Sequence, residues 1–170
     1  MTKPRIIMIA AMAKNNVIGK NGRLPWDESL TEDFQHFRLR TAGRPLIMGR
    51  GTFDSLPKKP LPGRPNIVMT HDKSFSHEGV IVAYSYDEAI KRATELAGEH
   101  GEIMVIGGAS IYKEALPSAD RMILTHVDMD VEGDTYFPEF SMNDWKAVSQ
   151  EARPTNPPMN FVVYERKPAA

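Results

Sequence analysis

A chain of 170 residues fits one domain and can bury a core without disulfides or metals. Its 41% hydrophobic and 25% charged residues are typical of a globular protein and exclude a disordered one. The 21 basic and 22 acidic residues are well mixed, which argues against a nucleic-acid binder, and the lack of cysteine excludes disulfides, thiolate metal sites and cysteine nucleophiles.

The first apolar segment, residues 6–13, follows Lys3 and Arg5. It is at the short end for the apolar part of a signal peptide and far below the roughly 20 residues of a membrane span. We therefore expect a buried first strand and a cytoplasmic protein.

Short apolar runs bounded by turn residues recur along the chain, and their Ile, Val and Met content is typical of strands buried on both faces. We expect strands at residues 6–11, 45–48, 66–69, 80–83, 102–106 and 121–126. Helical spacing predicts helices at residues 31–41, 86–98 and 110–116. Ser85 with Glu88 resembles a capping box, and Gly98 a C-cap. Strands that alternate with helices indicate an α/β fold with a mainly parallel sheet.

The pattern changes toward the end of the chain. Strands expected at residues 125–131, 144–151 and 160–167 are separated by loops and not by helices. Such strands would add an antiparallel edge. The predicted fold is thus one α/β domain over residues 1–170, with a mixed, mainly parallel central sheet flanked by helices and an antiparallel C-terminal edge.

Asp33 stands beside Phe34 and Phe37 in the first predicted helix. A carboxylate on an apolar face is costly to bury unless another group pairs with it, so Asp33 is a candidate functional acid. The alternative is structural: Asp33 is one of several acidic residues near the start of this helix that favour the helix dipole. The residues alone leave both open.

Two strands run into glycine-containing corners that open helices. The first corner is Gly49-Arg50-Gly51-Thr52 and the second is Gly107-Gly108. Glycine lets a ligand approach the backbone, and Arg50 could bind a phosphate. Neither corner is a P-loop or a G-x-G-x-x-G motif, but two in one short chain favour a nucleotide cofactor. His71, His77, His100 and His126 show no metal-binding spacing.

Taken in order, these segments resemble the dihydrofolate reductases, and most closely the bacterial chromosomal type. The matching pieces run from Ile9 to Pro138 and read IAAMAKNNVIG, LPW, DFQHF, PLIMGRGTF, LPGRPNIVMT, EIMVIGGASIY, LTHVD and EGDTYFP. The resemblance implies the reduction of dihydrofolate by hydride transfer from NADPH to pterin C6, with protonation at N5.

By this resemblance, Asp33 is the active-site acid that anchors the pterin, and Thr125 hydrogen-bonds to it. Leu24 and Trp26 would lie on the loop that closes over the nicotinamide, and Arg64 would bind the α-carboxylate of the glutamate tail. The residues expected to contact the substrate are Ile9, Ala11, Asp33, Phe34, Phe37, Leu56, Arg64, Ile106, Tyr112 and Thr125.

The resemblance also implies a set of NADPH contacts. These are Ala13, Ile18, Gly19, Gly49, Arg50, Gly51, Thr52, Met69, Thr70, His71, Ile106, Gly107, Gly108, Ala109, Ser110, Ile111 and Tyr112. The family has a cis peptide bond at Gly107-Gly108. The 2′-phosphate would meet Arg50 and the strand end at Thr70-His71, where the lack of an acidic residue predicts a preference for NADPH over NADH.

The chain departs from the family pattern at three places. The Trp26-to-Asp33 connection is two residues longer, which leaves Glu32 as an alternative acid. Gly51 replaces a larger residue, and Leu24 stands where methionine is common. We further expect a monomer in which roughly residues 45–100 form an adenosine-binding subdomain. The rival functions are a riboflavin-pathway reductase on the same fold and a non-catalytic NADPH-binding protein.

Overall fold

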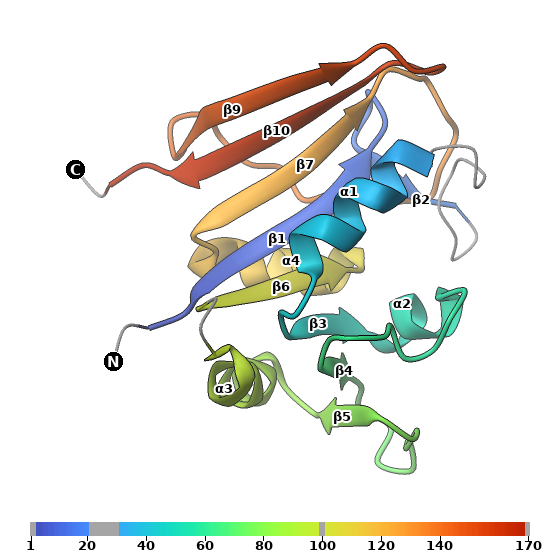
Figure 1. The fold of residues 1–170 in the computed structure, drawn as a ribbon, viewed down its shortest axis with the longest axis vertical. Helices are drawn as coiled ribbons and strands as arrows, with labels where there is room; N and C mark the ends of the chain where they lie inside the picture. Colours follow the sequence, from blue (N-terminus) through green and yellow to red (C-terminus); the bar gives the residue numbers. More distant parts are fainter. Residues whose placement is uncertain (1–2, 21–30, 99–100, 169–170) are drawn as a thin grey trace.

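The computed structural model describes residues 3–20, 31–98 and 101–168, and in these ranges eight strands form one central sheet. The strand order is β5-β4-β3-β6-β1-β7-β10-β9. The strands are β1 (Arg5–Met12), β3 (Leu46–Gly49), β4 (Asn66–Met69), β5 (Val80–Ala83), β6 (Glu102–Gly107), β7 (Arg121–Val127), β9 (Trp145–Arg153) and β10 (Met159–Arg166). Figure 1 shows the sheet from β9 at one edge to β5 at the other.

Pairing is parallel from β5 to β7, because crossover connections, most of them containing a helix, return the chain to the same end of the sheet. β10 runs antiparallel to both β7 and β9. The predicted fold class, a mainly parallel sheet with an antiparallel C-terminal edge, is therefore confirmed.

Helices cover both faces of this sheet. The α-helices of the described residues are α1 (Thr31–Thr41), α2 (Arg50–Ser55), α3 (Tyr86–Leu96) and α4 (Ala109–Ala115). Figure 1 shows α1 in front of the sheet and α4 behind it. α3 and α4 pack on the face that carries Ile6 and Met8, whereas Phe37 and Phe53, from α1 and α2, pack on the face of Ile7 and Ile9. Alternate side chains of β1 thus pack into two hydrophobic cores, one on each face of the sheet.

The cap predicted at Ser85, before α3, is present. The Ser85 side chain accepts a hydrogen bond from the Glu88 backbone N–H at 3.1 Å, and Glu88 in turn accepts one from the Tyr84 N–H at 3.2 Å. At the other end Ala97 is the C-cap, and Gly98 follows it with a φ of +58°. That left-handed conformation is the one that glycine supplies after a helix.

One local expectation is wrong. No strand spans residues 125–131: Thr125 belongs to β7, which ends at Val127, and the apolar Met129 and Val131 pack against the cluster of Ala13 and Val17 instead of extending the sheet. Sequence reasoning also missed the small sheet formed by β2 (Val17–Gly19) and β8 (Thr135–Tyr136), since runs of two or three residues carry no readable periodicity. None of the helices described is long and apolar enough to cross a membrane.

Candidate active site

The carboxyl ends of β1, β3, β6 and β7 lie at the same edge of the sheet, because these strands are parallel. In open α/β sheets, ligands bind outside this edge. Most of the predicted site residues lie at or near these ends or on the first turns of α1, α2 and α4.

Asp33 lies in the first turn of α1 and faces Thr125 of β7. The Thr125 hydroxyl, which is buried, donates a hydrogen bond to the Asp33 carboxylate. Burial raises the pKa of Asp33, and this hydrogen bond partly opposes the rise. A carboxyl group with a raised pKa in a cleft is a typical catalytic or ligand-binding acid.

The neighbouring carboxylate is oriented differently. Glu32 is exposed, and its Oε2 lies 3.3 Å from Nε of Arg153 on β9. The structure therefore brings Asp33, and not Glu32, against Thr125. The burial of Asp33 also disfavours the alternative in which it is only a solvated first-turn acid.

The apolar residues predicted to line the substrate pocket divide into three groups. Phe37, Leu56 and Ile106 are half-buried and pack on the cluster that contains Ile9. Ala11 lies opposite Thr125 in the β1–β7 pairing and packs with the neighbouring cluster. Phe34 projects from α1 with 38% of its surface exposed, unusually much for phenylalanine, as expected of a side chain that a ligand would cover.

Tyr112 is buried in α4, and its hydroxyl donates a 2.6 Å hydrogen bond to the carbonyl oxygen of Ile9. Burial, together with the nearby charge of Asp33, raises the pKa of Tyr112, so the phenol stays neutral. The contact ties α4 to β1 close to the acid.

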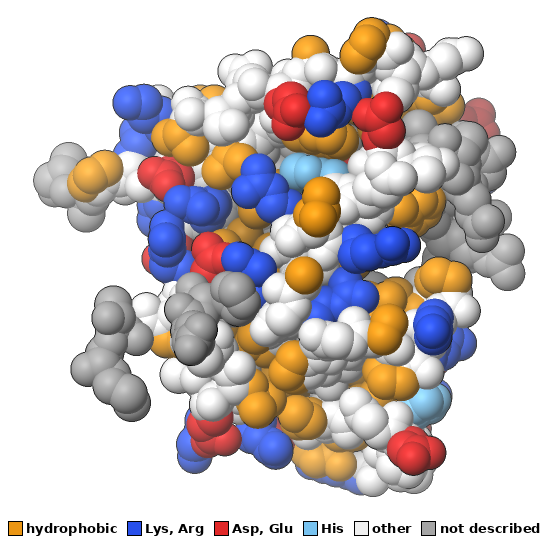
Figure 2. Space-filling model, in the orientation of Figure 1, with side chains coloured by type: hydrophobic (Ala, Val, Ile, Leu, Met, Phe, Trp, Pro, Cys, Tyr) orange, Lys and Arg blue, Asp and Glu red, His pale blue; other side chains and the backbone are white. Residues whose placement is uncertain are grey.

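Arg64 is positioned by the end of α1. Its Nη1 donates to Oγ1 of Thr41 at 2.8 Å, and its Nε donates to the Pro62 carbonyl oxygen at 2.9 Å. Burial, and to a smaller extent the charge of Arg38, lowers the pKa of Arg64. Arg64 is half-buried and Arg38 is exposed, and two neighbouring guanidinium groups can attract an anion. Figure 2 shows basic side chains on the face that α1 crosses.

The two glycine corners lie side by side. A Cβ at Gly49 would come within 3.2 Å of Cγ1 of Ile111, and one at Gly108 within 3.4 Å of Oγ1 of Thr52. The Gly107-Gly108 peptide bond is cis, as the resemblance implies, and Gly107 has a φ of +121°. Side chains larger than hydrogen would collide with the facing corner, so glycine lets the two corners pack closely.

Comparison with known proteins decides the family. The family profile described as Dihydrofolate reductase matches residues 5–166. The chain belongs to the dihydrofolate reductase family. It is 42% identical over 151 residues to dihydrofolate reductase type 3 of Salmonella typhimurium, with 89% of each chain covered. It is 41% identical over 146 residues to the dihydrofolate reductase of Haemophilus influenzae, with 86% of each covered.

A solved structure supports the same conclusion. The dihydrofolate reductase from Enterococcus faecalis complexed with NADP(H) and RAB-propyl superposes with a TM-score of 0.87 at 31% identity, over 96% of this chain and 97% of that one. The predicted family, fold and enzyme class are thereby confirmed. The roles of individual residues stay predictions.

The remaining predicted site residues lie on or next to β1, β2 and β4, or fall outside the described residues. Leu24 and Trp26 fall in residues 21–30, which the structure does not describe. Ile18 and Gly19 lie in β2, which pairs with β8, and Ala13 is buried just after β1. Met69 ends β4, and Thr70 and His71 follow it.

Sequence reasoning missed two charged residues at this reductase site. Arg38 lies near Arg64, and the signal was available, because Phe34, Arg38 and Thr41 share one face of a helix at spacings of four and three. The second is Asp72, whose carboxylate lies 3.6 Å from Nη1 of Arg50. The expectation that no acidic group stands at this strand end is therefore wrong.

Proposed function

We propose that the chain catalyses the NADPH-dependent reduction of 7,8-dihydrofolate to 5,6,7,8-tetrahydrofolate. The observation that carries the proposal is the partly buried Asp33 carboxyl bonded to Thr125, at the sheet edge of a dihydrofolate reductase fold. The nicotinamide, when bound, supplies a hydride to pterin C6, and one proton is taken up at N5.

Asp33 holds the pterin. The 2-amino group and N3 of the ring are neighbouring donors that fit the two oxygens of one carboxylate. Burial raises the pKa of Asp33; the acid holds and polarises the ring, and water would deliver the proton to N5. Thr125 fixes the carboxyl orientation, while Ile9, Phe37 and Ile106 exclude bulk water.

Arg64 binds the α-carboxylate of the glutamate tail. Its bonds to Thr41 and Pro62 hold the guanidinium with Nη2 left for a ligand, and Arg38 adds positive charge. This pair favours folate over the ribosylamino-pyrimidine substrate of a riboflavin-pathway reductase, which has no glutamate tail. Arg64→Gln is expected to raise KM for dihydrofolate more than it lowers kcat.

The cofactor lies along the glycine corners in this proposal. The backbone at Gly49, Gly107 and Gly108 approaches the phosphates, the Cβ position of Gly51 faces open space, Thr52 and Ser110 offer hydroxyl groups, and Arg50 meets the 2′-phosphate. Ala13, Ile18 and Gly19 flank the nicotinamide, and Leu24 and Trp26 belong to the loop that closes over it. Roughly residues 45–100 form the adenosine-binding subdomain.

We also propose a monomer in the cytoplasm. All of the groups assigned above come from one chain, so a partner subunit is not needed to complete the site. The cysteine-free composition fits a reducing compartment.

The direct test is the oxidation of NADPH by the purified chain with and without dihydrofolate. We expect oxidation that depends on dihydrofolate and yields one tetrahydrofolate per NADPH. Binding of NADPH without such turnover would support the non-catalytic rival. Turnover with a ribosylamino-pyrimidine, whose sugar is reduced to a ribityl group, in place of dihydrofolate would support the riboflavin-pathway rival.

A further inference from the structure

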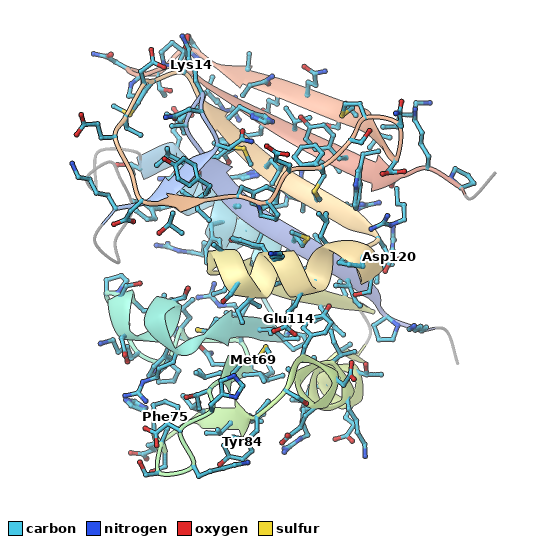
Figure 3. The ribbon with its side chains drawn as sticks, turned by 180° about the vertical axis from the view of Figure 1, so that it is seen from behind. Lys14, Met69, Phe75, Tyr84, Glu114 and Asp120 are labelled. Atoms are coloured by element: carbon cyan, nitrogen blue, oxygen red, sulfur yellow. The ribbon has the colours of Figure 1, made fainter. Side chains whose placement is uncertain are left out.

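Carboxylates flank the guanidinium of Arg50. Its Nε lies 3.1 and 3.2 Å from the two oxygens of Asp54, one helical turn along α2, and its Nη1 lies 3.6 Å from Oδ2 of Asp72. The ring of Phe75 packs against one side of this guanidinium, whose central carbon lies 4.1 Å from the ring centroid. Figure 3 shows Phe75 together with Met69 and Tyr84 in the part of the molecule formed by β4 and β5.

Asp72 is fixed by its own loop. Its Oδ1 accepts hydrogen bonds from the backbone N–H of Ser74 at 2.9 Å and from the Ser74 hydroxyl at 2.6 Å. These bonds, with a smaller contribution from Arg50, lower the pKa of Asp72 and keep it ionised at neutral pH. Since Oδ1 is held by Ser74, Oδ2 stays directed toward Arg50.

The side chains of Arg50 and Asp72 line the same cavity. Arg50, Asp54, Asp72 and Ser74 are among the residues that line a space of about 420 Å³ next to the carboxyl end of β4. A ligand phosphate that approaches the exposed side of Arg50 there also approaches the carboxylate of Asp72.

We propose that Asp72 is a cofactor-selectivity residue that weakens the preference of the adenosine site for a 2′-phosphate. This inference rests on the proposed function, in which Arg50 meets that phosphate. In dinucleotide sites generally, an acidic residue beside the ribose favours the free 2′-hydroxyl, whereas an arginine favours the 2′-phosphate. This chain has both groups within 3.6 Å, so part of the attraction of Arg50 for a dianion is offset by repulsion from Asp72.

Asp72 differs from Asp54 in this respect. Asp54 lies on the same helix as Arg50 and its pairing at (i, i+4) can be exchanged for a phosphate by rotation of an exposed side chain. Asp72 comes from the loop after β4, and its bonds to Ser74 oppose such a rotation. The loop therefore holds the Asp72 carboxylate where it repels a phosphate that binds Arg50.

The test is the ratio of the dissociation constants of NADH and NADPH, measured by titration without substrate. Asp72→Asn removes the charge but keeps an oxygen that can accept from Ser74. We expect this ratio to rise by about three- to fivefold, the usual size of an exposed charge interaction. Asp144→Asn, which removes an exposed carboxylate in the turn before β9, should leave the ratio unchanged. A ratio in Asp72→Asn within twofold of wild type, or below it, overturns the inference.

Arg50→Gln completes the cycle. Arg50→Gln is expected to lower the ratio toward one, because it removes the attraction for the 2′-phosphate. Adding Asp72→Asn to Arg50→Gln should raise the ratio again, because the repulsion between Asp72 and the phosphate does not pass through Arg50. No rise in the double variant would show that Asp72 acts only by pairing with Arg50 and would contradict a direct repulsion. Wild-type protein that binds both dinucleotides but shows no dihydrofolate-dependent oxidation would refute the proposed function, while the binding ratio still decides the role of Asp72.

Discussion

At the scale of single residues, the placement of Asp33 costs stability, because folding removes its carboxyl from water and leaves Thr125 to compensate only in part. A raised pKa means that the folded state binds the proton more tightly than the unfolded state does. The free energy of unfolding contributed by this group is highest below the unfolded pKa of about 3.9, and it declines as the pH rises through the folded pKa.

Asp33→Asn is therefore expected to stabilise the protein at neutral pH. The amide avoids the burial of a charge and its oxygen still accepts the hydrogen bond of Thr125, so we expect a gain of roughly 0.5–2 kcal/mol in the free energy of unfolding. Urea denaturation at pH 7 and at pH 4 measures the effect, and the gain should shrink at the lower pH. An unchanged or reduced stability at pH 7 would show that the burial of Asp33 is not the dominant influence on it.

The Thr125 hydroxyl also affects the pKa of Asp33. Because its hydrogen bond lowers the pKa of Asp33, Thr125→Val is expected to raise that pKa further. The limb of the kcat/KM pH profile that reports Asp33 should then move to higher pH, whereas Thr125→Ser, which keeps a hydroxyl, should stay near wild type. A profile in which both variants lose activity equally at every pH would indicate that Thr125 matters only for packing.

At the scale of secondary-structure elements, the sequence predicts best where periodicity and burial agree. The predicted bounds match β4 (Asn66–Met69), a fully buried run between turn residues, and they also match α1 (Thr31–Thr41) and β5 (Val80–Ala83). A strand was expected at residues 125–131, but Met129 and Val131 pack against Ala13 and Val17 without forming one. Only the tertiary structure distinguishes these outcomes.

α1 is also attached to the sheet by a residue that the sequence did not single out. The ring of His36 stacks on Phe161 of β10 with centroids 4.0 Å apart and planes 3° apart. Its Nε2 is buried without a hydrogen-bond partner among the described residues. Burial first, and then the charge of Arg40, lowers the pKa of His36 to about 4.

His36→Phe should make the protein less sensitive to acid. A depressed folded pKa means that stability is present above the unfolded value of about 6.5 and is lost as the pH falls toward 4. Allowing for the partial exposure of the ring, wild type should lose on the order of 1–2 kcal/mol from this group over that range, a loss that phenylalanine removes while it keeps the stack. Denaturation between pH 7 and pH 4 measures this, with His71→Asn, at an exposed histidine, as the control. Identical pH dependence in His36→Phe and wild type would contradict the assignment.

At the scale of the whole molecule, the sheet order explains why residues far apart in the chain form one site. The carboxyl ends of β3, β6, β1 and β7 are neighbours, so the glycine corners lie beside the strands that carry Ile9 and Thr125. The types of residue could be predicted from the sequence, and the cis Gly107-Gly108 bond from the family resemblance. The proximity of Asp72 to Arg50 could not, because it depends on how the loop after β4 folds back on α2.

The most direct test of the account compares dihydrofolate reduction by wild type, Asp33→Asn and Glu32→Gln at pH 7. We predict that Asp33→Asn lowers kcat/KM by a factor on the order of 10²–10⁴, the usual contribution of a positioned acid, while the dissociation constant of NADPH stays within about threefold of wild type. Glu32→Gln, which changes only an exposed ion pair with Arg153, should remain near wild type. Retention of wild-type activity by Asp33→Asn, or its loss in Glu32→Gln, would contradict the assignment of Asp33 as the active-site acid.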